Sequence, residues 1–478
     1  MAGFVAYGDY DGDIHTHFLK PKMEFRKSKP TGVLSYPTTQ APVNAAELLR
    51  LHMRHAQTAS DPACVRMGLM PTPRVFFRIT PLTRLSVPLL LNAWETIPGA
   101  PVIQVVNGPP DGAGRGDTVL YSFLTTQLPD LHTEILCLRE KGVVLVAGGP
   151  HAAADPEFMR RIGFHSAITG DGEAALPELA RNLEAGLELK PEYTGGRKND
   201  ISKWLPYSRS VRTLPPLELM RGCAHNCTYC AVPLSGPLRF RSLDSARDYL
   251  EQLHSYGARR VNFISPSALE YRDSHTGTDP LESVADLLAT ARHIGFRHIE
   301  YGIFPSEIRP GSLNREWLRL LREHVSHTRL TLGAQSGCPE RLRRLRRGHT
   351  PEDVEASVIA ANQAGFGVNL DVMVGFPNES LQELITTLNF IRRLHRNHRI
   401  HAQVHHFMPL PGTILQHALP SFPGIKGREK LLQMEKDGLI TGHWKLGARV
   451  ARRYLAWVQE HHPCTYERFL TTKETRLS

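Results

Sequence analysis

Three cysteines within one short run constrain this chain more than any other feature of its sequence. The run reads Arg221-Gly222-Cys223-Ala224-His225-Asn226-Cys227-Thr228-Tyr229-Cys230, with the spacing Cys-x3-Cys-x2-Cys. Three thiolates are one ligand short of a closed tetrahedral zinc site and of a fully ligated [4Fe–4S] cluster. A cluster held by three cysteines leaves one iron open to a small molecule. The alternative is a zinc site completed by His225, but that histidine lies between two ligands rather than on a second knuckle.

Composition agrees with an intracellular enzyme. The 478 residues suggest two or three domains, and 41% of them are hydrophobic. No run of about 18 apolar residues predicts a membrane span, and the first residues do not resemble a signal peptide. Only three of the seven cysteines are clustered, which argues against a disulfide framework and for a reducing compartment. The sequence therefore predicts a cytoplasmic protein that does not bind membranes.

The net charge of +10 raises the question of nucleic-acid binding. Much of the charge lies on helix-like segments such as Arg341–Arg347, and no aromatic residues alternate with these arginines. Such a run is more often the solvated face of a helix than a phosphate track. Modest basicity also suits a pocket for anionic cofactors. We therefore do not expect a nucleic-acid partner.

Strand-like and helix-like segments alternate from Arg74 onward, whereas residues 1–73 show no readable motif. Apolar runs at 75–79, 102–106, 119–122, 143–147 and 165–169 are separated by helical segments. This alternation predicts a parallel sheet over residues 74–186 that is covered on both faces. Ligands of such sheets bind in the loops beyond the carboxyl ends of the strands.

Those loops carry a recognisable pattern. Gly148-Gly149-Pro150-His151-Ala152 follows one strand, Gly170-Asp171-Gly172-Glu173 follows the next, and Ser122–Thr126 follows the middle strand. In this order they resemble the cobalamin-binding domain that precedes many radical S-adenosylmethionine (SAM) cores. The resemblance implies a Rossmann-like (flavodoxin-like) fold. It also implies cobalamin contacts from Ser122, Thr125, Gly148, Gly149, His151, Gly170, Gly172 and Glu173.

One departure concerns the cobalt ligand. Cobalamin domains of mutases carry Asp-x-His-x-x-Gly, but the loop Thr80–Ser86 after the first strand has no histidine. The resemblance therefore implies cobalamin without a histidine ligand from the protein. A decayed domain that binds no cobalamin would show the same absence.

A second α/β array follows a linker at 187–214. Strand-like runs at 217–220, 260–264, 298–303, 329–333, 368–374 and 402–407 alternate with helices. They predict a partial (β/α)6 TIM-type barrel over 215–415, with its site at the carboxyl ends of the strands. Residues 416–478 look helical and amphipathic, so we expect a C-terminal helical cap.

Motifs along this second array resemble those of the radical SAM superfamily. Beyond the cysteine loop they are Pro305-Ser306-Glu307-Ile308-Arg309-Pro310, Gln335-Ser336-Gly337, Arg347-Gly348-His349-Thr350 and Gly375-Phe376-Pro377. The domain order resembles a family known as cobalamin-binding domain/radical SAM domain proteins. Where family members carry Gly-Gly-Glu for the SAM amino group, this chain has Ser265-Pro266-Ser267.

The resemblance assigns a role to each motif. Cys223, Cys227 and Cys230 would bind a [4Fe–4S] cluster, and Tyr229 would lie near the SAM adenine. The remaining SAM contacts would come from Ser265, Glu307, Gln335, Ser336, Arg347 and Gly375. Arg347 would meet the SAM carboxylate as a bidentate partner, and Glu307 the ribose or a polar substrate group. No acid–base or nucleophilic catalytic residue is assigned, because the cofactors carry the difficult steps.

The implied function is reductive cleavage of SAM to a 5′-deoxyadenosyl radical, with electrons from an external flavodoxin- or ferredoxin-type donor. The leading hypothesis is a cobalamin-dependent methyltransferase that acts on an unactivated carbon of an unknown substrate. The alternatives are a cobalamin-dependent rearrangement or cyclisation, methylthio transfer to tRNA, and a non-catalytic cobalamin or redox sensor. Methylthio transfer calls for three cysteines in the N-terminal domain, where only Cys64 and Cys137 occur. It also calls for a small RNA-binding barrel at the C-terminus, where the sequence looks helical.

Overall fold

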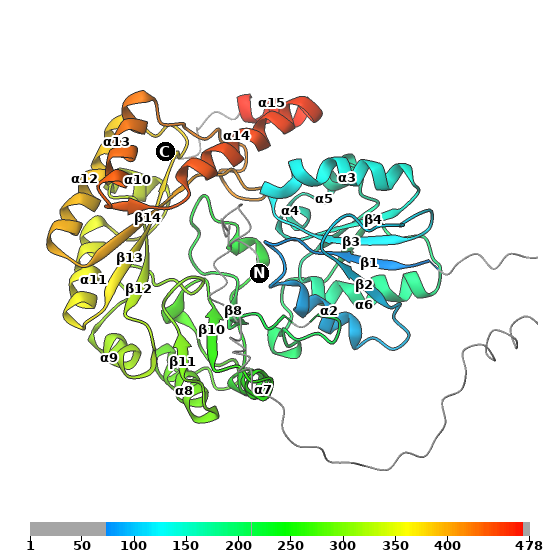
Figure 1. Ribbon diagram of the computed structural model, residues 1–478, viewed down its shortest axis with the longest axis horizontal. Coiled ribbons are helices and arrows are strands. Elements are labelled where there is room, and N and C mark those ends of the chain that lie inside the picture. Colours follow the sequence, from blue (N-terminus) through cyan, green and yellow to red (C-terminus); the bar gives the residue numbers. More distant parts are fainter. Residues whose placement is uncertain (1–72, 212, 472–478) are drawn as a thin grey trace, which may run out of the picture. The chain divides into compact units, whose positions relative to one another are not determined.

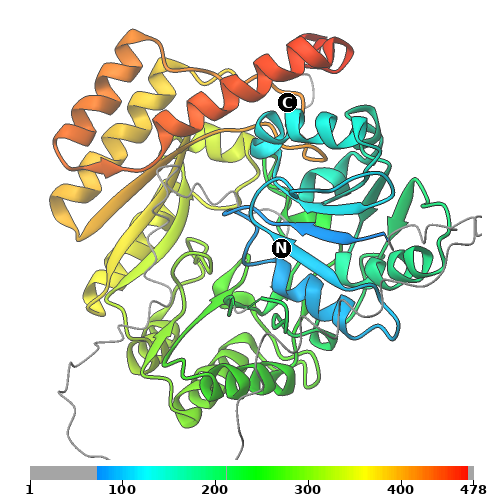
Figure 2. The same ribbon diagram turned by 45° about the vertical axis from the view of Figure 1, so that its right-hand side comes forward.

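The computed structural model describes residues 73–211 and 213–471, shown from two directions in Figures 1 and 2. All of these residues belong to one structural unit. The extension expected over residues 1–73, with Cys64, lies outside the described residues except for Pro73. Within the described part of the chain, no helix is both long and apolar enough to cross a membrane.

The first part of the chain forms one six-stranded parallel sheet. Its strands are β1 (Val75–Arg78), β2 (Ile103–Val106), β3 (Thr118–Ser122), β4 (Val144–Gly148), β5 (Ser166–Thr169) and β6 (Glu192–Thr194). They pair in the order β2-β1-β3-β4-β5-β6, and every pair is parallel. The order of the first five strands is that of flavodoxin-like folds, so the expected fold class is confirmed.

Strand β6 lies in the segment that the sequence suggested was a linker. Tyr193 is fully buried, whereas Glu192 and Thr194 on either side of it are exposed. A three-residue strand with one apolar side chain gives almost no periodic signal, and Pro191 and Gly195 beside it are typical of a loop. The strand forms because its backbone completes the open edge of β5.

Helices cover both faces of this sheet. They are α2 (Val87–Glu95), α3 (Leu128–Glu140), α4 (Pro150–Ala154), α5 (Pro156–Arg161) and α6 (Gly172–Glu184), with a short 3-10 turn η1 (Thr125–Gln127). Apolar side chains of α2 and α6 pack in one core, and those of α3, α4 and α5 pack in another. Two separate cores explain why the central strand β3 is buried along its whole length.

The second array forms an open wall of parallel strands. It contains β7 (Leu217–Glu218), β10 (Arg260–Ile264), β11 (His298–Glu300), β12 (Arg329–Gln335), β13 (Gly367–Val374), β14 (Ile400–His406) and β15 (Ile440–Thr441). The strands pair as β7-β10-β11 and as β12-β13-β14-β15. Ile308 joins the two groups, because its amide donates to the Thr331 carbonyl at 2.9 Å. The wall has two ends, as expected for a partial barrel.

Helices pack against the outer face of this wall. They are α7 (Leu243–Ser255), α8 (Pro280–Ile294), α9 (Arg315–His324), α10 (Pro339–Arg344), α11 (Pro351–Gln363) and α12 (Leu381–Asn397). Short 3-10 turns occur at η2 (Ile201–Lys203), η3 (Val232–Ser235) and η4 (Ala268–Glu270). Alternate residues of β13, such as Leu370 and Val372, belong to the core shared with these helices. Asp371 and Met373 therefore point to the opposite face, into the barrel interior.

The C-terminal segment is helical, as expected, but it also adds a strand. After α13 (Ile425–Lys436), β15 pairs with β14, and then α14 (Trp444–His461) and α15 (Pro463–Thr471) follow. Tyr454, Trp457 and Val458 of α14 lie in the same core as α3 and α5 of the first sheet. Helix α14 therefore belongs to the core of the first domain as well as packing on the barrel.

Candidate cluster and cofactor site

The three cysteines lie in a loop that connects the two strands of a short antiparallel pair. Strand β8 (Met220–Arg221) pairs with β9 (Arg239–Phe240), and residues 222–238 between them form the cysteine loop. The two ends of the loop meet at Gly222 and Pro237, which we call its neck. A Cβ on Gly222 would lie 2.5 Å from the Pro237 carbonyl oxygen. Gly222 also has a φ of +83°, so glycine is required there on both grounds.

Each cysteine sulfur accepts one hydrogen bond. The His225 amide donates to Cys223 Sγ at 3.4 Å, the Val232 amide to Cys230 Sγ at 3.4 Å, and Arg347 Nη1 to Cys227 Sγ at 3.5 Å. Burial raises the pKa of Cys223, and it raises the pKa of Cys230 to about 12. Donors aimed at sulfur are the outer contacts that stabilise thiolates bound to iron.

This arrangement fits an iron–sulfur cluster better than zinc. Among the residues that the structure describes, no three His, Cys, Asp or Glu side chains converge on a single-ion site. His225 does not join the cysteines, because its Nε2 lies 2.7 Å from Glu270 Oε1. A [4Fe–4S] cluster takes one cysteine per iron and so needs sulfurs spread further apart than one ion does. The cysteine loop supplies three cysteines, which agrees with a cluster that keeps one iron open.

Arg347 links the cysteine loop to the barrel. Its Nη2 donates to the Gly333 carbonyl on β12 at 2.7 Å, and its Nη1 lies 3.3 Å from the Tyr229 hydroxyl as well as near Cys227. The Tyr229 ring meets the Phe376 ring edge-on, with the centroids 5.6 Å apart. The fold thus brings Tyr229, Arg347 and Phe376 together beside Cys227.

Two carboxyl groups lie next to this arginine in the barrel interior. A Cβ on Gly333 would lie 3.2 Å from each of Arg347 Nη2, Gln335 Nε2 and Glu307 Oε2, so these three side chains converge over that glycine. Glu307 also shares a hydrogen bond with Asp371 of β13, which is 7% exposed. Burial raises the pKa of both carboxyls, while Arg347 acts in the opposite direction on Glu307. Burial of two neighbouring carboxyls disfavours the state in which both are charged.

The turn after β13 contains a further buried acid. The Gly375 amide donates to Glu379 Oε2 at 2.5 Å, and burial raises the pKa of Glu379 to about 7. Gly375 has a φ of +79°, and a Cβ there would lie 2.3 Å from His406 Nε2. The expected turn is present, and its glycine makes room for His406.

Two of the predicted serines are engaged within the protein. Ser265 is fully buried and its hydroxyl donates to the Ser267 carbonyl at 2.8 Å. Ser336 is 1% exposed, and its hydroxyl lies 3.0 Å from that of Thr387 in α12. Both serines therefore hold strand-end loops in place, and a ligand there would meet backbone groups.

The glycines of the first domain are explained by close backbone packing. A Cβ on Gly149 would lie 2.4 Å from the Phe123 carbonyl oxygen, and one on Gly148 would lie 2.9 Å from the Tyr121 oxygen. A Cβ on Gly170 would lie 2.1 Å from the Gly196 oxygen, and one on Gly172 would meet the Leu90 side chain. Gly149 and Gly170 thus allow close approach of loop backbone, Gly148 lies close to the neighbouring strand β3, and Gly172 makes room for a side chain of α2.

The polar residues of the same edge fall into two groups. His151 is 2% exposed and stacks on Phe158, and burial lowers its pKa to about 3. Glu173 is 3% exposed and forms an ion pair with Arg221 at 2.5 Å. In contrast, the hydroxyls of Ser122 and Thr125 at the end of β3 make no hydrogen bond within the described part of the chain. These two hydroxyls, and the buried Nδ1 of His151, which has no hydrogen-bond partner, are available to a cofactor over this edge.

Comparison with known proteins gives a family for the second array. Residues 217–391, from β7 to the middle of α12, match the model of the radical SAM superfamily. The matched segment contains the three cysteines and the side chains that converge over Gly333. This match assigns residues 217–391 to the radical SAM superfamily.

Curated relatives of this radical SAM protein are distant. An uncharacterized protein of Methanopyrus kandleri is 23% identical over 56% of the chain, and a tRNA-2-methylthio-N(6)-dimethylallyladenosine synthase of Prosthecochloris aestuarii is 24% identical over 62%. An uncharacterized methyltransferase of Pyrococcus horikoshii is 25% identical over 63% of the chain and 68% of its own length. The chain spans 61% and 66% of the length of the first two relatives.

Solved structures extend the likeness in fold to the first domain. The methyltransferase TsrM from Kitasatospora setae, with cobalamin and a [4Fe–4S] cluster bound, superposes with a TM-score of 0.54 at 16% identity. The match covers 72% of this chain and 77% of TsrM. OxsB with aqua-cobalamin and SAM bound gives 0.51 at 15% identity, over 77% of this chain and 56% of OxsB. The likeness in fold to these enzymes therefore includes the sheet domain that precedes the radical SAM barrel in this chain.

Several residues of the radical SAM site gave no signal in the sequence. Asp371 could have been noticed as a charged residue within an apolar strand, since such a residue must face the barrel interior. Glu379, Glu270 and Arg221 are single charged residues at the ends of strands or in loops, and no spacing in the sequence links them to the cysteines. Only the fold brings their side chains to the cysteine loop and the strand ends.

Proposed function

We propose that this chain is a radical SAM enzyme that cleaves SAM reductively and transfers a methyl group from cobalamin to an unactivated carbon. The observation that carries the proposal is the convergence of the cysteine loop, Arg347 and the Glu307–Asp371 pair at the carboxyl ends of the barrel strands. When bound, the cluster supplies one electron to SAM, and cobalamin supplies the methyl group.

The chain's own residues would bind and orient the reactants. Cys223, Cys227 and Cys230 would hold the cluster, and the donor on each sulfur would stabilise the thiolate. Arg347 would offer its guanidinium to the SAM carboxylate, and Tyr229 with Phe376 would flank the adenine. The Glu307–Asp371 pair would face the substrate and offer it carboxyl oxygens for hydrogen bonding.

Support for cobalamin comes from the first domain. Ser122 and Thr125 present free hydroxyls at the carboxyl edge of its sheet, where parallel α/β folds bind ligands. TsrM and OxsB, whose structures contain cobalamin, share the fold of both domains. Glu173 has an ion-pair partner within the protein, whereas the Nδ1 atom of His151 is buried without a hydrogen-bond partner. That nitrogen, the two hydroxyls and the backbone groups of the loops would therefore make the contacts.

Methylthio transfer to tRNA is the second candidate, because the Prosthecochloris aestuarii relative carries that name. That reaction was expected to need three cysteines in the N-terminal domain, and the sequence has two before the loop. The C-terminal segment is helical rather than a small barrel. Methyl transfer therefore ranks first.

The decisive experiment is anaerobic reconstitution with iron, sulfide and hydroxocobalamin, followed by ultraviolet–visible and EPR spectra with dithionite and SAM. We expect about four irons per chain, an EPR signal that shifts with SAM, and one equivalent of bound cobalamin. Formation of methionine and 5′-deoxyadenosine would be measured by mass spectrometry. Cys227→Ala should abolish all cluster signals, and Cys137→Ala, an exposed cysteine of α3, is the matched control.

Each hypothesis gives a different outcome. A cluster without cobalamin would contradict methyl transfer from cobalamin and revive methylthio transfer. Cobalamin binding without SAM cleavage would favour the sensor. Binding of both cofactors, with SAM cleaved but no methyl group transferred from cobalamin during turnover, would favour a rearrangement or cyclisation.

A further inference from the structure

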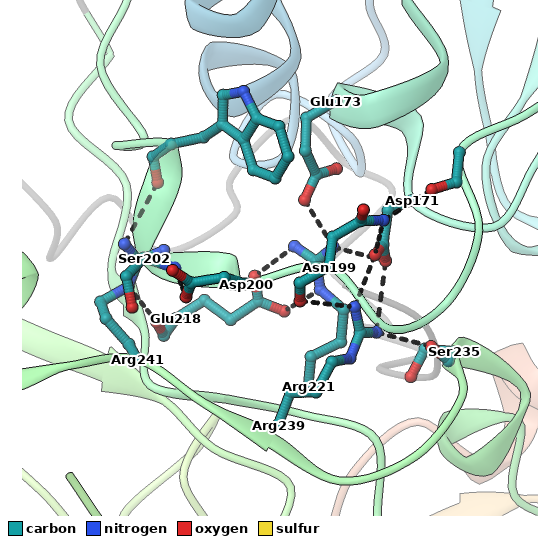
Figure 3. Close-up of polar contacts among 12 residues, drawn as sticks. Asp171, Glu173, Asn199, Asp200, Ser202, Glu218, Arg221, Ser235, Arg239 and Arg241 are labelled. Carbon is teal, nitrogen blue, oxygen red and sulfur yellow. Dashed lines mark hydrogen bonds and ion pairs between the residues drawn. The ribbon is translucent and has the colours of Figure 1, made fainter. Parts of the chain in front are cut away.

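A buried network of six charged side chains surrounds the neck of the cysteine loop (Figure 3). It contains three carboxylates and three arginines, so its net charge is zero: Asp171, Glu173, Glu218, Arg221, Arg239 and Arg241. Each side chain is exposed by 10% or less. Asp171 precedes helix α6 of the first domain and Glu173 lies in its first turn, whereas the others flank the cysteine loop.

Arg221 is the centre of this network. Its Nη1 lies 2.8 Å from Asp171 Oδ1 and 2.5 Å from Glu173 Oε1, and its Nη2 lies 2.7 Å from Glu218 Oε2. In sequence it stands two residues before Cys223, with only Gly222 between them. Any displacement of the Arg221 backbone is therefore passed directly to a cluster ligand.

The strand pair at the neck has an unfavourable charge pattern of its own. Arg221 and Arg239 are directly opposite each other in the β8–β9 pair. Like charges at opposite positions destabilise an antiparallel pair. Asp171 bridges the two, because its other oxygen, Oδ2, lies 2.5 Å from Arg239 Nη1. The strand pair that closes the cysteine loop thus depends on a carboxylate from another domain.

Further contacts join the same surfaces. Asn199 donates to Asp171 Oδ2 at 2.8 Å, and the Asn199 carbonyl accepts from Arg239. Arg239 also donates to the Ser235 carbonyl within the cysteine loop at 2.7 Å. Arg241, fully buried, holds the Glu218 carbonyl at 2.7 Å. Both ends of the cysteine loop are therefore tied to the edge of the first sheet.

We propose that Asp171 and Glu173 are positioning residues for the iron–sulfur cluster, which they orient toward SAM by fixing Arg221 and Arg239 at the neck of the cysteine loop. The inference rests on the proposed cluster at Cys223, Cys227 and Cys230, and it does not depend on cobalamin. The first domain then has a role in the radical chemistry that is separate from cofactor binding.

The test compares two substitutions in the same helix. Glu173→Gln removes one carboxylate of the network, whereas Glu178→Gln removes an exposed carboxylate of α6 that pairs with Lys190. Iron content, bound cobalamin and an EPR titration with SAM would be measured for the reconstituted full chain. We expect Glu173→Gln to raise the SAM concentration that half-converts the EPR signal by about 10-fold, as outer contacts of metal sites do. Glu178→Gln should match the unmodified protein.

Two further variants distinguish a positioning role of Glu173 from a general destabilisation of the fold. Glu173→Asp keeps the charge and should recover part of the SAM response. Glu173→Gln leaves one unbalanced positive charge, so adding Arg239→Gln restores neutrality and should also move the EPR signal back toward that of the unmodified protein. If Glu173→Gln does not fold, Asp171→Asn, which keeps the size of the side chain, takes its place.

Failure of the inference differs from failure of the proposed function. An unmodified protein that takes up no cluster would remove the proposed function itself. An unmodified protein with a SAM-responsive cluster, and a Glu173→Gln protein with the same response, would overturn the positioning role. Loss of cobalamin from Glu173→Gln with an unchanged SAM titration would likewise overturn it and assign Glu173 to cobalamin.

Discussion

Arg347 shows how much one side chain does at this site. It contacts a cluster ligand, the Tyr229 hydroxyl and the Gly333 carbonyl with the two ends of one planar group. A lysine carries the same charge but has a single nitrogen, so it cannot make these contacts together. The geometry of the guanidinium, rather than its charge alone, joins the cysteine loop to β12.

We therefore expect Arg347→Lys to bind SAM roughly 10-fold more weakly, because it loses one charge-assisted hydrogen bond of about 1.5 kcal/mol. EPR titration of the reconstituted protein measures the affinity. Arg343→Lys, an exposed arginine of α10, is the control and should leave it unchanged. Equal affinities for both variants would contradict the role given to Arg347.

Glu379 makes the stability of the fold depend on pH. Burial raises its pKa from 4.5 to about 7, so the native state holds a proton that the unfolded chain releases. Its contribution to stability is complete below pH 4.5 and is lost as the pH rises through 7. Glu379→Gln removes this loss. The free energy of unfolding of Glu379→Gln should therefore exceed that of the unmodified protein by roughly 3 kcal/mol at pH 8. Near pH 4.5 the two free energies of unfolding should be equal.

Urea unfolding at several pH values between 4.5 and 8 measures the effect of Glu379→Gln. Glu467→Gln in the exposed part of α15 should follow the unmodified protein throughout. A constant difference across this range would show that the carboxyl does not titrate there.

At the scale of elements, the loops at the carboxyl edge of the first sheet depend on glycines that touch backbone. Gly149 combines a φ of +98° with a carbonyl oxygen 2.4 Å from its would-be Cβ. Gly186, at the end of α6, has a φ of +62° with nothing within 4 Å. The two positions share the backbone constraint and differ in the space around them.

Gly149→Ala should lower the free energy of unfolding by roughly 3 kcal/mol, since backbone strain and a clash add together. Gly186→Ala should lower it by about 1 kcal/mol, since only the backbone term applies. Chemical denaturation of both variants measures the difference. Equal effects would mean that the β3 and β4 loops can move apart without loss.

The sequence predicts the elements better than it predicts the site. Continuous apolar strands such as β3 and β13 are found from composition alone, because a covered parallel sheet requires them. The cysteines, Tyr229 and Arg347 are also found, because their motifs are local. Glu173 is different: the sequence placed it in a cofactor loop, and the fold pairs it with Arg221, 48 residues away. Contacts across such distances leave no local pattern.

At the scale of the whole molecule, α14 joins the barrel to the first domain. A Cβ on Gly447 would lie 3.0 Å from that of His406 in β14, whereas Trp457 ten residues later packs on Phe158 of α5. One helix thus contributes to the barrel wall at its start and to the core of the first sheet at its end. Unfolding of either domain must disturb the other.

Trp457→Ala should therefore destabilise the whole chain by roughly 3–5 kcal/mol, the usual loss for truncating a buried aromatic residue. Unfolding followed by far-ultraviolet circular dichroism measures the change, with Arg449→Ala on the exposed side of α14 as control. A loss confined to an early, separate transition would show that the two domains unfold independently.

The position of α14 also bears on how the chain reaches its native state during synthesis. The residues of the first sheet leave the ribosome long before α14 is made. The apolar surface around Phe123 and Phe158 therefore stays uncovered until α14 has been translated. Through that interval the nascent sheet is exposed to aggregation and available to chaperones. The cysteine loop, synthesised between the two, would meet a first domain that is not yet closed, which gives iron insertion an opportunity before folding is complete.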